Sequence, residues 1–243
     1  MSIVWITGAS GGVGSAAARL FAQNGYDVAA GYCRGKDSAE ALCGELRACG
    51  VRALPVFADV SDGASVRKAH EAIVDALGEV DVLVNNAGVS QQKLFTDMTE
   101  AEWRRMFAVH VDGAFHCTQA VLPHMIHEKR GKIVNISSVW GLRGASCEVH
   151  YAAAKAALIG LTRSLACELG PSGICVNCVA PGVIDTPMNA CHTAETIRAL
   201  ADETPLMRIG SPDEAAQAIF FLSSPAADFI TGQVLCADGG FSV

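Results

Sequence analysis

Short runs of apolar, β-branched residues alternate with helix-like stretches along the whole chain of 243 residues. The runs that predict strands are 3–7, 28–32, 51–57, 80–85, 133–136, 174–179 and 234–237. The stretches that predict helices are 13–24, 39–49, 65–77, 100–107 with a continuation to 127, 151–169 and 213–222. Such alternation is typical of a parallel sheet with helices on both faces. The sequence therefore predicts a doubly wound, Rossmann-type α/β fold. Since no linker or repeat interrupts the pattern, we expect a single domain over 1–243.

Composition narrows the class of protein. Hydrophobic residues make up 51% of the chain and charged residues 18%, which is enough for a large core and argues against disorder. The net charge of -7 argues against nucleic acid as the main partner. No apolar run reaches the length of a membrane span. Residues 1–6 resemble a first strand and not a signal peptide. We therefore expect a cytoplasmic protein.

The cysteines and histidines show no metal-binding pattern. Ten cysteines are scattered along the chain, and we expect them to be free thiols in a reducing compartment. Cys175 and Cys178 are three apart in a predicted strand, so their side chains should lie on opposite faces. The seven histidines form no recognisable ligand set. No metal site is predicted.

A glycine-rich turn joins the first predicted strand to the first predicted helix. Gly8, Gly12 and Gly14 would let the backbone turn tightly and let a diphosphate approach the helix N-terminus, where free N–H groups favour anions. The spacing G-x-x-x-G-x-G differs from the common G-x-G-x-x-G of dinucleotide sites. A tight turn without a ligand is the alternative.

The end of the second predicted strand indicates which dinucleotide would bind. No acidic residue stands at 31–34 to accept hydrogen bonds from an adenosine ribose. Arg34 and Lys36 could instead hold a 2′-phosphate, which favours NADPH. The alternative is an ordinary basic surface loop. Asp59 and Val60 close the third strand, where we expect contact with the adenine ring.

A tyrosine and a lysine four residues apart carry the predicted chemistry. Tyr151 and Lys155 stand in an alanine-rich stretch with strong helix propensity, so their side chains leave one face of a helix. A nearby cation lowers the pKa of a phenol toward the working range of an acid or base. Ser138, just after the predicted strand 133–136, could reach the same point and hydrogen-bond a substrate oxygen. The alternative is an ordinary solvated helix face.

Taken together, the motifs resemble the short-chain dehydrogenase/reductase family over essentially the whole chain. The matching pieces are Thr7-Gly8-x-x-x-Gly12-x-Gly14, Asn85-Asn86-Ala87-Gly88, Ser138, Tyr151-x-x-x-Lys155, Pro181-Gly182 and Asp238-Gly239-Gly240. Within the family the chain is most similar to 3-oxoacyl-[acyl-carrier-protein] reductases. It also resembles elongation factor P 5-aminopentanone reductases, notably over 140–151 and 177–189.

The resemblance implies roles for individual residues. Tyr151 would protonate the substrate oxygen, Lys155 would lower the pKa of Tyr151 and hold the nicotinamide ribose, and Ser138 would position the carbonyl. The cofactor would be NADPH/NADP+. The residues expected to contact it are Gly8, Ser10, Gly12, Val13, Gly14, Tyr32, Arg34, Asp59, Val60, Asn85, Ala87, Gly88, Tyr151, Lys155, Pro181, Gly182, Ile184 and Thr186. Ile184 and Thr186 would lie at the nicotinamide end.

Two positions depart from the family pattern. His110 stands where the family usually has an asparagine that completes a catalytic tetrad, and a histidine could also hold a water or shuttle a proton. A satisfied core histidine is the alternative. Lys129, Arg130 and Lys132 precede the strand 133–136, and we expect them near the mouth of the site, where they would meet an acidic carrier protein. A merely solvated basic run is the alternative, and Ser172 stands where such reductases often have an arginine.

The sequence thus predicts an NADPH-dependent enzyme that reduces a ketone to a secondary alcohol. The first substrate hypothesis is a 3-oxoacyl thioester on acyl carrier protein, as in fatty-acid synthesis. The second is the elongation factor P 5-aminopentanone reaction, and a hypothesis of another class is a non-catalytic nucleotide-sensing regulator. A substrate-side segment of loop and helix is expected at about 188–210. Family resemblance and small apolar helix faces at 114–125 and 152–169 predict a homotetramer.

Overall fold

The computed structural model describes residues 2–189 and 193–242. In these residues seven strands form one parallel sheet in the order β3-β2-β1-β4-β5-β6-β7. The strands are β1 Ile3–Ile6, β2 Asp27–Tyr32, β3 Ala53–Phe57, β4 Val82–Asn85, β5 Gly131–Ile136, β6 Ile174–Pro181 and β7 Val234–Ala237. The order reverses direction between β1 and β4. In sheets of this kind, ligands bind in the crevice outside the carboxyl ends of the strands at that reversal.

Helices connect the strands. The α-helices of the described residues are α1 Gly12–Gln23, α2 Lys36–Arg47, α3 Gly63–Ala76, α4 Glu100–Phe107, α5 Gly113–Glu128, α6 Trp140–Arg143, α7 Val149–Leu169, α8 Ala194–Glu203 and α9 Pro212–Ser223. Short 3-10 turns occur at η1 Phe95–Asp97, η3 Gly170–Ser172, η4 Pro187–Asn189 and η5 Pro225–Ala227. The element η2, Ala108–Asp112, is a π-helical turn between α4 and α5.

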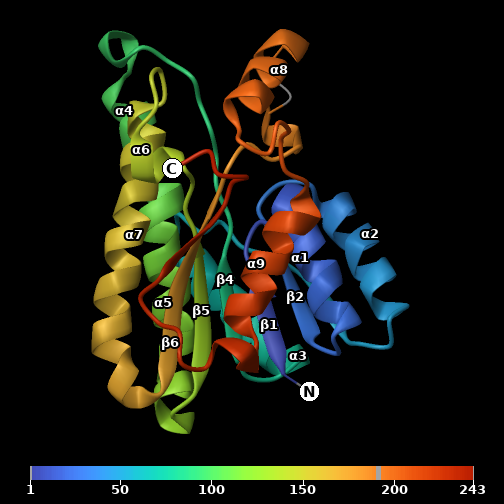
Figure 1. Cartoon of the computed structure of the whole chain (residues 1–243). Helices are drawn as coiled ribbons and strands as arrows, with labels where there is room; N and C mark the ends of the chain where they lie inside the picture. Colours follow the sequence, from blue (N-terminus) through green and yellow to red (C-terminus); the bar gives the residue numbers. More distant parts are fainter. Residues whose placement is uncertain (1, 190–192, 243) are drawn as a thin grey trace.

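Side-chain alternation along the strands builds two cores, one on each face of the sheet. In β1, Val4 and Ile6 belong to the core beneath α1, α2 and α9, whereas Ile3 and Trp5 belong to the core beneath α3, α5 and α7. This is the period-two pattern of a strand covered on both faces. Figure 1 shows the sheet between these two layers of helices. The predicted doubly wound α/β fold is therefore confirmed.

The structure differs from the sequence prediction in detail. Residues 140–143, which lie outside the predicted helices and strands, form the single helical turn α6. The long helix expected from 100 to 127 is interrupted by the π-helical turn η2. Each hydrogen bond of such a turn spans one residue more than in an α-helix, so α4 and α5 are separate helices. Within the predicted substrate-side segment, α8 occupies 194–203, while 190–192 lie outside the described residues.

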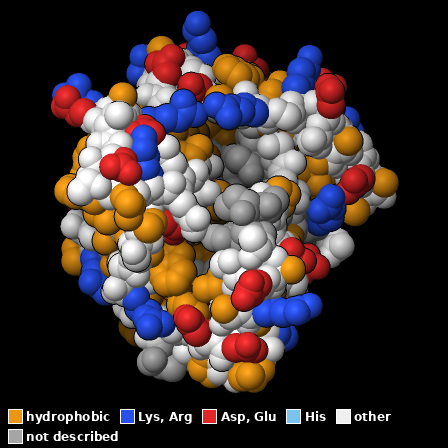
Figure 2. Space-filling model, turned by 90° about the horizontal axis from the view of Figure 1, so that it is seen from above, with side chains coloured by type: hydrophobic (Ala, Val, Ile, Leu, Met, Phe, Trp, Pro, Cys, Tyr) orange, Lys and Arg blue, Asp and Glu red, His pale blue; other side chains and the backbone are white. Residues whose placement is uncertain are grey.

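The carboxyl ends of the strands lie at one end of the molecule, and sheets of this kind bind ligands there. In Figure 1, α4, α6 and α8 stand at this end, above the sheet. Seen from above, the same end is hollowed (Figure 2). Every helix in the described part of the chain is too short or too polar to cross a lipid bilayer.

Candidate active site

A cavity of about 1290 Å³ opens at the carboxyl ends of the strands. This exceeds the roughly 300–1,000 Å³ of ordinary small-molecule pockets, so there is room for a dinucleotide together with a small substrate. Residues that follow β1, β2 and β3, with the first residues after β4, line one end, and residues that follow β5 and β6, with Gln91 of the loop after β4, line the other. The first is called the nucleotide end below and the second the reacting end.

The nucleotide end begins with the glycine-rich turn after β1. Gly8 and Gly12 have φ values of 65° and 55°, a region that favours glycine. The Asn86 amide group holds the turn by donating to the carbonyl oxygens of Thr7 and Gly8 at 2.9 and 3.0 Å. Helix α1 begins directly after the turn, and no described side chain caps its N-terminus. Free N–H groups and the positive end of the helix dipole therefore meet the cavity, which fits the diphosphate of a dinucleotide.

The outer part of the nucleotide end lies beyond β2 and β3. Arg34 and Asp59 both line the cavity there. The Asp59 carboxylate accepts hydrogen bonds from the Ser61 N–H at 3.1 Å and the Ser61 hydroxyl at 2.6 Å. The guanidinium of Arg34 has no hydrogen-bond or ion-pair partner among the described residues. This part of the cavity thus presents a positive charge without a counterion.

The reacting end contains the predicted serine, tyrosine and lysine. Ser138 follows β5, whereas Tyr151 and Lys155 stand one turn apart on α7, and all three line the cavity. Lys155 is nearly buried, and its Nζ donates to the carbonyl oxygen of Ile136 at 2.7 Å. The same nitrogen lies 5.5 Å from the centre of the Tyr151 ring. The arrangement can offer a substrate oxygen two hydroxyl groups, with a fixed ammonium close behind them.

The predicted effect of Lys155 on the pKa of Tyr151 is wrong for this structure. Burial raises the pKa of Tyr151 to about 12, and the neighbouring Ser138 hydroxyl only partly opposes this shift. Burial also lowers the pKa of Lys155 to about 8. Loss of water around both groups disfavours their charged forms, and for Tyr151 it exceeds the opposing effect of the Ser138 hydroxyl. Tyr151 therefore keeps its proton at neutral pH, as a general acid must.

His110 lies behind the cavity wall and not in it. Its ring packs edge-on against Tyr151 with 5.5 Å between ring centres. The Nε2 atom lies 2.8 Å from the Val89 carbonyl oxygen and 3.2 Å from the Val89 nitrogen, and Nδ1 has no partner in the described structure. Burial, followed by the Lys155 charge, lowers the pKa of His110 well below its usual value, so the ring is neutral. A catalytic role for His110 remains a prediction.

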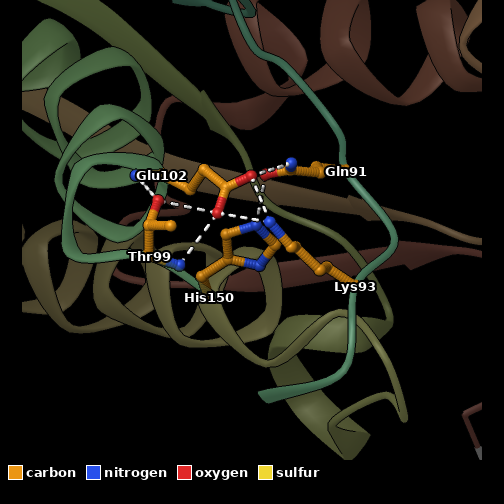
Figure 3. A network of polar contacts seen from close by, with 5 residues as sticks. All are labelled: Gln91, Lys93, Thr99, Glu102 and His150. Atoms are coloured by element: carbon orange, nitrogen blue, oxygen red, sulfur yellow. Dashed lines mark hydrogen bonds and ion pairs between the residues drawn. The ribbon is translucent and has the colours of Figure 1, made fainter. Parts of the chain in front are cut away.

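A polar network ties the loop after β4 to the segment that carries Tyr151 (Figure 3). The Glu102 carboxylate accepts hydrogen bonds from Gln91 at 2.7 Å, from Lys93 at 2.8 Å and from the Thr99 N–H at 2.8 Å. Gln91 in turn contacts the buried His150 ring at 3.2 Å. Hydrogen bonds, first that of Lys93, hold the pKa of Glu102 well below its usual range. Glu102 therefore stays ionised and holds the loop at all ordinary pH values.

A backbone contact adds to this network. The Lys93 N–H donates to the Cys147 carbonyl oxygen at 2.7 Å. Gln91 on one loop, and Ser146 and Glu148 on the other, line the cavity. The walls of the reacting end are thus two loops held to each other by these contacts.

Most of the predicted cofactor-contacting residues lie on the cavity surface, although their roles remain predictions. Those on the surface are Gly8, Ser10, Gly12, Val13, Arg34, Asp59, Val60, Ala87, Gly88, Tyr151, Lys155, Pro181, Gly182, Ile184 and Thr186. Three lie behind it. A Cβ on Gly14 would be 2.5 Å from the Gly8 carbonyl oxygen, so this glycine serves close packing of α1 on the glycine-rich turn. Tyr32 packs against Phe57, and the Asn85 amide donates to Thr118 and Asn135.

The basic run before β5 is misplaced by the sequence prediction. Lys129, Arg130 and Lys132 lie at the start of β5, whereas the chain's own cavity lies at the end of this strand. Six residues of strand separate the two positions by roughly 20 Å. Lys132 pairs with Asp228, and Arg130 with Asp81. The run therefore does not flank the mouth of the cavity in the same chain.

Several cavity residues were not predicted. They include Gln91 and Gln92 on the loop after β4, Arg105 on α4, and Trp140, Ser146 and Glu148 before Tyr151. No glycine pattern or strand end marks the first three, since they come from a loop and a helix whose packing is not visible in the sequence. The stretch 140–151 did carry a signal, namely its similarity to one branch of the family.

Comparison with known proteins places this site in a family. The sequence profile of the family described as "Enoyl-(Acyl carrier protein) reductase" matches residues 8–242. The chain is 39% identical to a 3-oxoacyl-[acyl-carrier-protein] reductase of Staphylococcus epidermidis, over 97% of this chain and 96% of the relative. It is 40% identical to that of Thermotoga maritima, over 98% and 96%.

A solved structure agrees with these relatives. The crystal structure of a 3-oxoacyl-[acyl-carrier protein] reductase from Brucella melitensis matches with a TM-score of 0.94 and 38% identity, over 100% of this chain and 91% of that one. Sequence, fold and the shared strand order thus agree. The chain belongs to the short-chain dehydrogenase/reductase family, whose members are oxidoreductases that use a nicotinamide cofactor.

Proposed function

We propose that this protein reduces a ketone to a secondary alcohol with NADPH. The observation that carries the proposal is the meeting of Ser138, Tyr151 and Lys155 on one wall of a cavity. The opposite end of the same cavity offers a glycine-rich turn at a helix N-terminus and the unpaired charge of Arg34. A 2′-phosphate is the anion that separates NADPH from NADH, and Arg34 suits it.

Each residue of the reacting end would have a separate task. Bound NADPH supplies the hydride. Ser138 donates a hydrogen bond to the ketone oxygen, and the Tyr151 hydroxyl gives its proton to that oxygen as charge develops there. The Tyr151 phenolate that remains is stabilised by the Lys155 ammonium, whose position is fixed by the Ile136 carbonyl. The raised pKa of Tyr151, about 12, supports the role of acid in the direction of reduction.

The first substrate candidate is a 3-oxoacyl thioester on acyl carrier protein. The support is similarity, since relatives that are 39% and 40% identical over nearly their whole length carry this activity in their names. An acetoacetyl thioester would place its ketone at Ser138 and Tyr151. Its chain would lie along the loops 89–92 and 144–148.

The second candidate is a ketone with an amino group, as in the elongation factor P 5-aminopentanone modification. The specific observation is a carboxylate, Glu148, in the cavity wall three residues before Tyr151. Gln91, Gln92 and Ser146 make the same wall polar. A carboxylate attracts an ammonium group and contributes nothing to an uncharged acyl chain.

One experiment separates these functions. Purified protein is given NADPH or NADH with an acetoacetyl thioester, or with an aliphatic amino ketone and the same ketone lacking the amino group, and nucleotide oxidation is followed. Faster turnover of the amino ketone than of its uncharged analogue, lost in Glu148→Gln, favours the second candidate. Thioester turnover unaffected by Glu148→Gln favours the first. Tight NADPH binding without oxidation by any ketone would indicate the nucleotide-sensing regulator.

We also propose that the protein assembles as a homotetramer. Phe115 and Ile126 on α5 are 47% and 45% exposed, and Val149 at the start of α7 is 37% exposed. Such apolar side chains on two helices suit contacts between subunits. Sedimentation at micromolar concentration tests this proposal, and a monomer would refute it.

A further inference from the structure

A second arginine lines the nucleotide end of the cavity. Arg105 belongs to α4, far along the chain from Arg34, and both arginines line the same cavity. Like Arg34, Arg105 has no hydrogen-bond or ion-pair partner in the described part of the chain. Its neighbour Arg104 differs, because it pairs with Glu100 on the surface of the same helix. Figure 2 shows Lys and Arg side chains along one rim of the hollow.

The position of Arg105 can be followed along its helix. Val109 comes four residues later and also lines the cavity. Val109 packs against the core cluster that contains Ala58 and Val60, the residues at the end of β3. Arg105 therefore stands about one turn from the wall at which the adenosine half of a dinucleotide would rest.

The charge of Arg105 also reaches the residue next to Arg34. Burial and then the Asp59 charge raise the pKa of the Cys33 thiol, while Arg34 and Arg105 both oppose this shift. Two positive charges from different elements thus act on the same atom. The Asp59 carboxylate, which also acts on Cys33, is already hydrogen-bonded by Ser61. Two guanidinium groups on different elements, Arg34 and Arg105, thus remain without a partner among the described residues at this part of the cavity.

We propose that Arg105 is a second ligand for the 2′-phosphate of NADPH and, with Arg34, sets the preference for NADPH over NADH. This inference rests on the proposed use of NADPH. A phosphate monoester carries nearly two negative charges at neutral pH and offers three acceptor oxygens, so one guanidinium leaves it partly unpaired. Arg34 approaches from the sheet and Arg105 from α4, so that the phosphate would lie between them.

The test uses nucleotide binding and not turnover. Calorimetry measures 2′,5′-ADP, which has the 2′-phosphate, and 5′-AMP, which lacks it. Arg105→Ala should weaken 2′,5′-ADP by about 10-fold, the usual effect of one charge-assisted hydrogen bond, and leave 5′-AMP unchanged. Arg104→Ala is the matched control and should change neither. Arg105→Lys should recover part of the loss, since it restores the charge without the two-pronged geometry.

The outcomes distinguish this inference from the function on which it rests. If Arg34→Ala weakens 2′,5′-ADP and Arg105→Ala does not, the role of Arg105 is refuted while NADPH use stands. If the parent protein binds 2′,5′-ADP no better than 5′-AMP, the NADPH proposal itself fails. Both arginine side chains are exposed, so the variants should fold, and thermal unfolding of each checks this.

Discussion

The two ends of the cavity differ in whether backbone or side-chain groups determine their shape. At the nucleotide end, the turn that would hold a diphosphate presents backbone groups, held by glycine conformations and by Asn86. At the reacting end, the walls are two loops whose relative position depends on side chains, above all on Glu102 and Gln91. A turn formed by glycine backbone tolerates few substitutions, because a side chain would change its conformation. The position of loops held by side chains can be altered by single substitutions.

The largest effect we expect is at the reacting end. Tyr151→Phe keeps the ring and removes the proton that the substrate oxygen needs. The kcat should fall by about 10²- to 10⁴-fold, while NADPH binding, measured by fluorescence titration, should persist because the nucleotide end is untouched. Tyr32→Phe is the control, since Tyr32 packs on Phe57 outside the cavity. Near-normal turnover of the Tyr151 variant would remove Tyr151 from the mechanism.

At the nucleotide end, a side chain added to a closely packed glycine should destabilise the fold. In Gly14→Ala the new Cβ would lie 2.5 Å from the Gly8 carbonyl oxygen and 2.6 Å from the Asn86 amide nitrogen. We expect the free energy of unfolding to fall by about 1–3 kcal/mol, with a loss of NADPH affinity, in urea denaturation and titration. Gly44→Ala on α2 is the control, because a Cβ there meets nothing within 4 Å. A Gly14 variant as stable as the parent would show that close packing does not explain this glycine.

The pH dependence of kcat tests whether the Lys155 ammonium stabilises the Tyr151 phenolate. The pKa of Lys155 is lowered from 10.5 to about 8, so Lys155 is an ammonium below that pH and a neutral amine above it. The kcat for reduction should be level below pH 8 and fall by up to about tenfold per unit above it, as the phenolate loses its stabilising charge. A profile that stays level to pH 10 would contradict this role.

Unfolding does not explain such a fall. Between pH 8 and 10.5 the unfolded chain binds a proton at this lysine that the folded chain does not, so the contribution of Lys155 to stability rises with pH. Only above pH 10, where the unfolded form of Tyr151 ionises and the folded form does not, does the contribution of Tyr151 decline. Unfolding curves at pH 7 and 9 should therefore not show a loss due to Lys155.

The smallest effect should come from the loop network. Glu102→Ala removes the shared acceptor of Gln91, Lys93 and Thr99, and so releases the loop after β4. The KM for the ketone should rise by about 2- to 10-fold, the scale of one or two hydrogen bonds, with the NADPH dissociation constant unchanged. Glu100→Ala, which breaks only the surface pair with Arg104, is the matched control. An equal change in both constants would show that the two ends are not independent.

Sequence reasoning predicted the layered fold because short β-branched runs and helical stretches have distinct patterns. It also predicted that Tyr151 and Lys155 share a helix face, since that follows from their spacing. It could not predict the pKa of Tyr151, because burial depends on how the whole chain packs. It misplaced Lys129, because a residue that precedes a strand lies at its amino end, and ligands of such sheets bind at the carboxyl ends. Arg105 and Glu102 were missed because only the packing of α4 brings Arg105 to the cavity and Glu102 to Gln91 and Lys93.

The π-helical turn Ala108–Asp112 sets the rotational phase between two helices. Successive residues of an α-helix are about 100° apart around the axis. Loss of a single residue from this turn would let α4 and α5 merge, and would rotate Glu102 and Arg105 by about that angle relative to the buried face of α5. Arg105 would then leave the cavity wall, and Glu102 would leave Gln91 and Lys93, while α5 kept its packing. A deletion of one residue here would therefore act like a change at several distant positions at once.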